Sequence, residues 1–251
     1  MDNFDALIAE ADAVPLAGWD FSWFAGRATE QRPSWGYADR VAARLTEATA
    51  ALDVETGGGE VFAYAAATAG GDRTRLVAVE SWRPNVPVAQ RTLAPYGGQV
   101  VESDLLPFRD ATFDLVVSRH PVHTHWAEIA RVLRSGGVYL SQQIGAGSNR
   151  ELSEAMLGPL PDPTAQHPEQ IAAGAEAAGF EVLDLRAESL RAEFYDIAAV
   201  AHFLRKVVWT VPDFTTEKYR DRLRAVHEEI TVKGMFVSYA QRVLIEARKC
   251  R

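Results

Sequence analysis

The chain has 251 residues, a formal net charge of −8 and a sequence pI of about 5.3, with acidic and basic residues interspersed. It shows no basic stripe of the kind that nucleic-acid-binding proteins carry, so its charge argues against a large RNA or DNA partner. A small neutral or cationic substrate suits this balance better. The 47% hydrophobic and 24% charged composition is that of an ordinary globular protein with a sizeable core.

Cysteine usage and apolar runs indicate the cellular compartment. The single cysteine, Cys250, excludes an internal disulfide and a zinc site of the finger type. No apolar run approaches the length of a membrane span, and the acidic start MDNFDALIAEADAV is unlike a signal peptide. We therefore expect a cytoplasmic protein with no membrane partner and no bound metal. The sequence does not indicate an oligomeric state.

The N-terminal arm, residues 1–37, is rich in aromatic side chains and is predicted to be irregular. A helix is predicted over residues 37–49, with Val41, Leu45 and Ala48 on one face. The aromatic residues of the arm are Phe4, Trp19, Phe21, Trp23, Phe24, Trp35 and Tyr37.

From residue 50 onward, short apolar runs alternate with helix-forming segments. This alternation predicts a doubly wound α/β fold, with helices on both faces of a mostly parallel sheet. The first five strands are predicted at residues 51–54, 76–79, 99–102, 113–118 and 137–142. The intervening helices are predicted at residues 60–68, 86–93 and 126–133.

The regular alternation ends after Gly145, where proline-rich loops surround a short helix. We predict a seven-stranded Rossmann-like sheet with an N-terminal lid and a C-terminal helical cap. The expected organisation is an arm and helix at residues 1–49, then one domain at 50–251 with cap insertions near 145–166 and 194–235. The later elements are predicted as helices at 167–178, 196–208 and 216–231 and strands at 180–185 and 242–247.

The segment LDVETGGGE, residues 52–60, predicts a ligand-binding turn between the first strand and the next helix. In an open parallel sheet ligands bind at the carboxyl ends of strands, and Gly57 and Gly59 allow positive φ and close backbone approach. A P-loop would need lysine after the glycines, where Glu60 stands. A dinucleotide loop would need a small residue at Phe62. Glu60 also places an anion at the helix N-terminus, which favours a cationic or zwitterionic ligand.

Four segments resemble, in order and spacing, the motifs of class I S-adenosylmethionine-dependent methyltransferases, of the type 11-like group. The resemblance spans about residues 46–142 and extends more loosely to the C-terminus. It implies a methyltransferase whose cofactor is S-adenosylmethionine. The segments are LDVETGGGE, VAVE, VESDLLPFRDATFDLVVS and EIARVLRSGGVYLSQ.

The same resemblance implies roles for individual residues. Glu80 ends the second strand, where the family binds the ribose hydroxyls. Asp104 would accept a hydrogen bond from the adenine amino group, and Leu105 would pack on the ring. The cofactor-binding residues expected are Asp53, Glu55, Gly57, Gly59, Glu80, Trp82, Asp104, Leu105 and Ser118.

Each of these residues also has a purely structural interpretation. The glycines could form a plain tight turn, Asp104 could form an Asx-type turn, and Trp82 could cover a hydrophobic edge. Glu55 departs from the family pattern, which usually has glycine there. Its carboxylate could point away, could face the cofactor's ammonium or sulfonium, or could block the pocket. We rank blockage last because the downstream motifs persist.

The segment SRHPVHTHW, residues 118–126, follows the fourth strand, where the family places substrate-facing residues. His120 is the expected general base for a hydroxyl or amine acceptor, and Arg119 the expected anchor for a substrate anion. His123 is a weaker substrate-contact candidate. The segment lacks the Asn/Asp-Pro-Pro-Tyr arrangement typical of amide or base nitrogen methylation. The histidines could instead hydrogen-bond backbone or solvent, and a metal site is disfavoured without a carboxylate ligand.

In enzymes that the chain resembles, the N-terminal segment often covers cofactor and substrate. Trp35 and Tyr37 would then line the pocket, or they could simply bury the arm against the sheet. We predict methyl transfer to an oxygen or nitrogen atom of a small molecule. The alternatives are an RNA methyltransferase and a non-catalytic regulatory protein that binds the cofactor.

Overall fold

The computed structural model describes residues 3–16, 21–70 and 74–250. The chain divides into two compact units. The first comprises residues 1–32, 146–164 and 189–241, and the second comprises residues 33–145, 165–188 and 242–251. Trp19, one of the aromatic residues of the arm, lies outside the described residues.

The second unit is built on parallel strands. Strand β2 pairs in parallel with β3 on one side and with β5 on the other. Successive strands are therefore added first on one side of β2 and then on its other side, which makes β2 the switch point of the sheet. β4 continues the sheet beyond β3, and β6 continues it beyond β5, both in parallel. The bounds are β2 (Ala50–Val54), β3 (Arg75–Glu80), β4 (Gln99–Glu102), β5 (Phe113–Arg119) and β6 (Leu133–Ile144).

The remaining strands are β1 (Ala28–Glu30), β7 (Phe180–Phe194) and β8 (Phe236–Lys249). β8 pairs antiparallel with β6, and β1 pairs antiparallel with β7. Over the described residues the sheet has eight strands in the order β1-β7-β8-β6-β5-β2-β3-β4, and most of it is parallel. The predicted count of seven was therefore one too low, because the three-residue edge strand β1 carries no alternation long enough to recognise.

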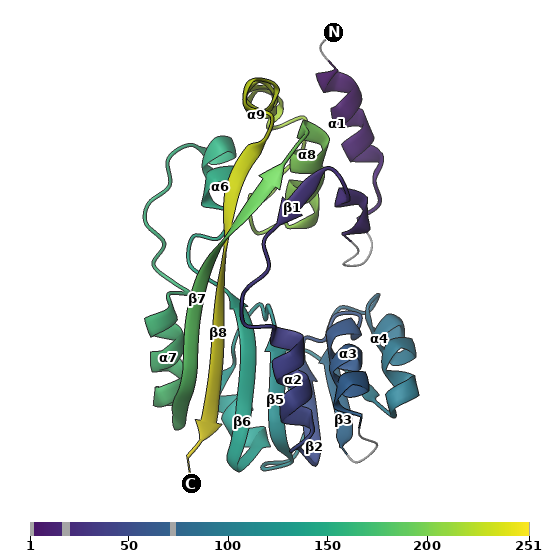
Figure 1. The fold of residues 1–251 in the computed structure, drawn as a ribbon, viewed down its shortest axis with the longest axis vertical. Helices are drawn as coiled ribbons and strands as arrows, with labels where there is room; N and C mark the ends of the chain where they lie inside the picture. The colour runs from purple at the N-terminus through teal and green to yellow at the C-terminus, as the bar shows by residue number, and fades with distance from the viewer. Residues whose placement is uncertain (1–2, 17–20, 71–73, 251) are drawn as a thin grey trace. The chain divides into compact units, whose positions relative to one another are not determined.

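Helices cover both faces of the parallel strands, as predicted (Figure 1). Alternate strand residues point to opposite faces: Leu115 packs in the cluster with α2 and α3, whereas Val116 packs in the cluster with α5 and α7. The helices of this unit are α2 (Tyr37–Leu45), α3 (Glu60–Ala69), α4 (Val86–Leu93), η2 (Ala94–Tyr96), α5 (Trp126–Val132) and α7 (Pro168–Ala177).

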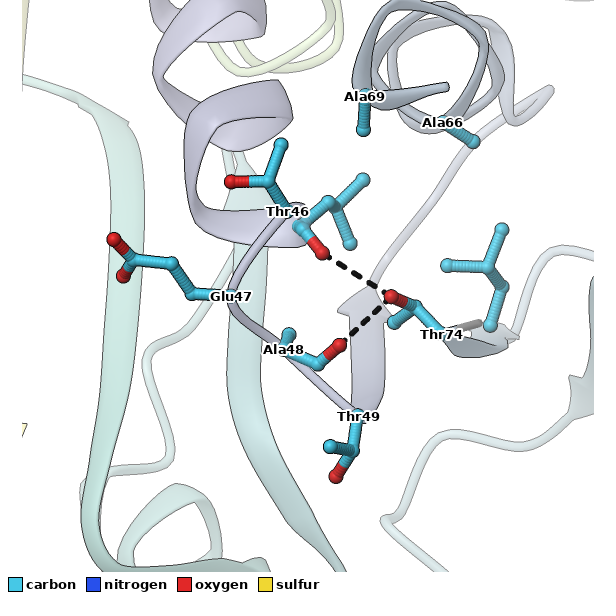
Figure 2. A pocket seen from close by; sticks show the side chains of 9 residues that line it. Thr46, Glu47, Ala48, Thr49, Ala66, Ala69 and Thr74 are labelled. Atoms are coloured by element: carbon cyan, nitrogen blue, oxygen red, sulfur yellow. Dashed lines mark hydrogen bonds between the residues drawn. The ribbon is translucent and has the colours of Figure 1, made fainter. Parts of the chain in front are cut away.

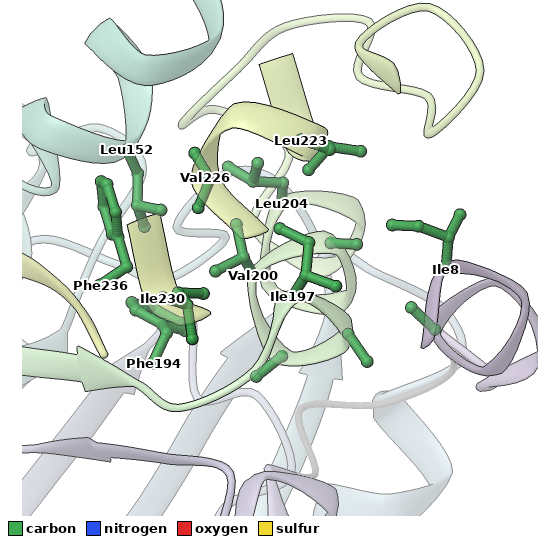
Figure 3. Packing of buried hydrophobic residues seen from close by; sticks show 14 of the residues in the cluster. Ile8, Leu152, Phe194, Ile197, Val200, Leu204, Leu223, Val226, Ile230 and Phe236 are labelled. Atoms are coloured by element: carbon green, nitrogen blue, oxygen red, sulfur yellow. The ribbon is translucent and has the colours of Figure 1, made fainter. Parts of the chain in front are cut away.

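The first unit has its own apolar core, in which side chains from several helices point toward one another (Figure 3). Its helices are α1 (Phe4–Ala13), η1 (Ser22–Phe24), α6 (Arg150–Leu157), α8 (Ile197–Lys206) and α9 (Arg220–Lys233). The arm is thus not irregular throughout, because Phe4, Ile8 and Ala11 bury one face of α1. Within the described ranges, no helix combines the length and apolarity required to cross a bilayer.

Candidate active site

The glycine turn after β2 is fastened to the end of β3. The Thr56 amide donates to the Val79 carbonyl at 3.1 Å, and the Gly57 amide donates to Glu80 Oε2 at 2.7 Å. Gly57 has φ +63°, and a Cβ there would meet no atom within 4 Å, so open space adjoins the turn. The turn therefore keeps the left-handed backbone and free approach that the sequence predicted for a ligand loop.

Glu80 is buried, and its second oxygen, Oε1, accepts from the Trp82 amide at 2.7 Å. A carboxylate offers about four lone-pair positions, of which these two amides use two. The carboxylate can therefore accept two further hydrogen bonds from a neighbouring pair of hydroxyls, which is the arrangement that a ribose presents. The residues present fit the sugar of S-adenosylmethionine.

Asp53 supports the turn from within the protein. Its Oδ2 accepts from Thr56 Oγ1 at 2.5 Å, and the residue is only 7% exposed. Burial raises the pKa of the Asp53 carboxyl to about 7, and the negative charge of Glu80 adds to the rise while Thr56 and Arg119 oppose it. Asp53 is thus a buried structural partner of the turn that titrates near neutral pH.

Glu55 occupies the left-handed region, with φ +57°. Its Oε2 accepts from the backbone amide of Val122 at 2.8 Å, and so joins the glycine turn to the segment after β5. Burial raises the pKa of Glu55, and the Val122 amide opposes this rise. The sequence left open where the Glu55 carboxylate points. In the structure it is directed at the loop after β5.

The residues expected around the adenine lie on the surface beyond β3 and β4. The side chains of Trp82 and Leu105 are 45% and 67% exposed, and Asp104, which precedes Leu105, is exposed as well. The Leu105 amide donates to Ser103 Oγ at 3.0 Å, which shapes this short turn. Trp82 and Leu105 thus present apolar surface just after the ends of β3 and β4.

Ser118 differs from these surface residues because its side chain is 1% exposed. Its Oγ lies 2.7 Å from Tyr139 Oη and 2.9 Å from Ser141 Oγ, within the sheet. The Ser118 carbonyl accepts from Tyr37 Oη at 2.8 Å. Its contacts are internal to the protein, so any effect on a ligand acts through the position of the strand end.

Arg119 is the last residue of β5, and His120 follows it at the same edge of the sheet. Arg119 is exposed and has no hydrogen-bond or ion-pair partner among the residues that the structure describes. His120 has φ +56°, and its backbone amide donates to the Gln142 carbonyl at 2.7 Å. Burial, reinforced by Arg242 and Arg119, holds the pKa of His120 well below its usual value. The imidazole is therefore neutral at neutral pH.

Trp35 and Tyr37 are buried, at 6% and 7% exposure, in the core beneath the site. The Trp35 indole Nε1 donates to Gln142 Oε1 at 2.8 Å. Gln142 was missed by sequence reasoning, although a pair of polar residues at the end of an otherwise apolar strand, LSQQ, was a usable signal. His123 is exposed, with its ring 6.2 Å from that of His125. Across the described residues, no three His, Cys, Asp or Glu side chains gather as a metal site would require.

Two hollows lie in the second unit. One of ≈ 220 Å³ adjoins the loop after β5 and is lined in part by His123, Thr124 and Gln143. The other, of ≈ 260 Å³, lies before the starts of β2 and β3, where Thr74 Oγ1 donates to the carbonyls of Leu45 and Ala48 (Figure 2). Because the second hollow is at the amino ends of the strands, it is separate from the site described above.

The fold is the Rossmann-like fold of methyltransferases, and the glycine turn lies at the carboxyl ends of its strands β2 and β3. Residues 52–141 match a family model described as a methyltransferase domain. No curated protein matches the chain by sequence. Residues 52–141 therefore form a methyltransferase domain of the class that uses S-adenosylmethionine as its cofactor.

Solved structures share the fold at low identity. A protein from Bacillus halodurans assigned as a methyltransferase is 21% identical, with a TM-score of 0.58 over 84% of this chain and 99% of that chain. A protein from Galdieria sulphuraria assigned as a sarcosine dimethylglycine methyltransferase is 16% identical, with a TM-score of 0.54 over 99% of both chains. Haemonchus contortus phosphoethanolamine N-methyltransferase 2, solved with phosphomonomethylethanolamine and S-adenosylhomocysteine, is 17% identical, with a TM-score of 0.53 over 86% of this chain and 53% of that chain.

Proposed function

We propose that this methyltransferase acts on an oxygen or nitrogen atom of a small molecule. The observation that carries the proposal is the buried Glu80 carboxylate, which is fixed by the Gly57 and Trp82 amides beside the open space at Gly57. This arrangement suits a nucleoside cofactor. The net charge of −8 weighs against a polyanionic acceptor, which favours a small molecule.

The cofactor would be held by residues at the ends of β2, β3 and β4. Glu80 would accept from the ribose hydroxyls, Asp104 from the adenine amino group, and Trp82 and Leu105 would contact the ring. Gly57 would allow the close approach of the amino acid portion. Gly59, also expected to bind the cofactor, would act by shaping the turn, because a Cβ there would lie 3.1 Å from the Leu93 side chain of α4. When bound, the cofactor supplies a methyl group on a sulfonium centre. Asp53, Glu55 and Ser118 would act by shaping the turn and the strand end.

The acceptor would lie against the loop after β5, where Arg119, His120 and His123 are placed. Two proteins of the same fold are named for small amine-bearing substrates, the Haemonchus and Galdieria enzymes described above. That likeness supports a small acceptor without specifying one. Alignment of acceptor and methyl group in a water-poor site is the main contribution that such residues can make.

A binding measurement tests the proposal. We expect S-adenosylmethionine and S-adenosylhomocysteine to bind the wild type in calorimetry. Glu80→Gln should lower the affinity for both compounds by about 10-fold or more, because it removes the charge that strengthens the hydrogen bonds from the ribose hydroxyls. Glu102→Gln is the matched control, because Glu102 ends the adjacent strand but is exposed and pairs with Arg83. Wild-type protein that binds neither compound at saturating concentration would contradict the assignment of the site.

Transfer of labelled methyl groups identifies the acceptor class. The enzyme should label at least one member of a set of small phenols, carboxylic acids and amines, and should not label a tRNA or rRNA fragment. Labelling of the RNA alone would favour the RNA methyltransferase alternative. Cofactor binding without transfer to any component of a metabolite extract would favour the regulatory alternative.

A further inference from the structure

Three side chains form a continuous hydrogen-bonded row from the core to the edge of the site. Trp35 Nε1 lies 2.8 Å from Gln142 Oε1, and Gln142 Nε2 lies 2.9 Å from His120 Nε2. Trp35 and Gln142 are 6% and 4% exposed. Because both are enclosed, water cannot readily replace either partner, and the directions of these bonds are fixed by the side chains themselves.

The direction of each bond follows from the indole. An indole N–H can only donate, so the group of Gln142 that faces Trp35 is its carbonyl oxygen. The amide nitrogen of Gln142 consequently faces His120, and an amide nitrogen can only donate. His120 Nε2 must therefore accept. In a neutral imidazole one nitrogen accepts while the other carries the proton, which places the proton on Nδ1.

The surroundings of His120 keep it in this neutral form. Burial and the positive charges of Arg242 and Arg119 lower the pKa of the imidazole. Nδ1 has no hydrogen-bond partner in the described part of the chain, and neither has the guanidinium of the adjacent Arg119. The end of β5 thus offers two neighbouring groups that can donate and cannot accept.

We propose that Trp35 and Gln142 are positioning residues that fix His120 as the Nδ1–H tautomer, so that His120 and Arg119 together bind an anionic oxygen group of the substrate. The tautomer follows from the structure alone, whereas the substrate contact rests on the proposed function. His120 is then a hydrogen-bond donor instead of the general base that the sequence suggested. The net negative charge of the chain led us to expect a neutral or cationic substrate. The two donors next to each other at the end of β5 instead favour a substrate with an anionic group.

Nitrogen-15 NMR of histidine-labelled enzyme tests the tautomer directly, because protonated and unprotonated ring nitrogens resonate far apart. At neutral pH the His120 signals should show a protonated Nδ1 and an unprotonated Nε2. Gln142→Glu should reverse this pattern, since a carboxylate accepts from both neighbours and would draw the proton to Nε2. Trp35→Phe should give a mixture of tautomers. Without the indole N–H, the side-chain amide of Gln142 can rotate and present either its oxygen or its nitrogen to His120.

The exposed His123 is the internal reference, and its signals should not respond to either substitution. A wild-type spectrum with the proton on Nε2 would overturn the proposal. An unchanged His120 tautomer in Gln142→Glu would do so as well. Neither result depends on cofactor binding, so they are separate from a failure of the proposed function.

Anion binding is tested with acetate, benzoate and inorganic phosphate, titrated in the presence of S-adenosylhomocysteine while the His120 resonances are followed. At least one anion should shift the Nδ1 signal, whereas benzamide, the neutral analogue of benzoate, should not. Arg119→Gln should lower the affinity for the responding anion by about tenfold or more, as expected for loss of a charged hydrogen-bond donor. No response to any of the three anions would overturn the substrate assignment, while cofactor affinity is measured separately.

Discussion

Glu55 combines an unfavourable backbone conformation with a specific side-chain contact. A residue with a Cβ in the left-handed region costs roughly 1–2 kcal/mol relative to the usual helical region, and glycine avoids this cost. The carboxylate of Glu55 offsets it by accepting from the Val122 amide. His120, the first residue of the loop that contains Val122, also has positive φ. Such strain is typical of functional sites, where the surrounding structure holds it in place.

Glu55→Gly separates the backbone requirement of the turn from the side-chain contact. We expect the affinity for S-adenosylmethionine, measured by calorimetry, to be retained or increased, because glycine adopts this φ freely. Glu55→Gln is the matched variant: it keeps an oxygen acceptor for the Val122 amide and removes the charge. A loss of affinity beyond about tenfold in the glycine variant, equivalent to about 1.4 kcal/mol, would show that the carboxylate itself binds the cofactor.

At the scale of elements, the packing of α7 against α5 depends on the absence of one side chain. A Cβ on Gly174 would lie 2.5 Å from the indole nitrogen of Trp126. That indole also lies against the rings of Tyr139 and Phe180, with centroids 5.3 and 5.9 Å away. Gly174 therefore allows α7 to lie against Trp126.

Gly174→Ala sets two effects against each other. Alanine favours a helix interior over glycine by about 1 kcal/mol, but crowding in a packed core costs about 1–3 kcal/mol. The rings of Tyr139 and Phe180 restrict the indole on two sides, so we expect net destabilisation by about 1 kcal/mol in urea unfolding. In a Trp126→Phe background, where the ring is smaller, the same change should be neutral or stabilising. A more stable Gly174→Ala in the wild-type background would show that the indole yields.

The elements of the second unit were predictable because each strand or helix has one clear period. α4 and β4 have the predicted bounds, and β2, β3 and β5 differ from theirs by one residue at one or both ends. β6 begins four residues before its predicted start and ends two residues after its predicted end. β7 and β8 extend beyond prediction because their outer halves bury only every second residue, such as Leu190, Ala192 and Phe194. The same alternation was present in the sequence. Likewise, the spacing of Phe4, Ile8 and Ala11 is helical, but the aromatic content of the arm obscured it.

The site was predictable where its residues act through the local backbone, as Gly57 and Glu80 do. It was not predictable where side chains meet across distant segments. Trp35 and Gln142 are 107 positions apart, and only the folded sheet brings them together. The direction of the Glu55 carboxylate was likewise unpredictable, because its partner, the Val122 amide, lies in a distant segment. A single sequence gives no measure of such long-range side-chain contacts.

At the scale of the whole molecule, every residue of the candidate site belongs to the second unit. The first unit has its own buried core and contains residues 1–32 of the arm and most of the segments expected as caps. The lid and cap roles assigned to residues 1–49, 145–166 and 194–235 remain predictions. The stability of the second unit is in turn coupled to its site, because Asp53 lies in both the sheet and the glycine turn.

This coupling predicts a pH dependence of stability. The Asp53 carboxyl has a pKa of about 7 in the folded protein and 3.8 as its ordinary value. Between these values the folded chain retains a proton that the unfolded chain has lost. The free energy of unfolding therefore falls as pH rises, by up to about 1.4 kcal/mol per pH unit from this group. The stabilising contribution is complete below about pH 4 and is lost as pH rises through about 7.

Urea unfolding of cofactor-free wild type and Asp53→Asn from pH 5 to pH 8.5 measures this effect. The stability of the wild type relative to the variant should decline with rising pH and level off above about pH 8. Asp114→Asn is the control. Burial opposes ionisation of its carboxyl, but hydrogen bonds from the Thr49 hydroxyl and the Ala50 and Thr49 amides lower its pKa overall. Its contribution therefore changes only in more acidic solution. If the difference between wild type and Asp53→Asn is constant over this range, Asp53 is already ionised and the buried turn tolerates its charge.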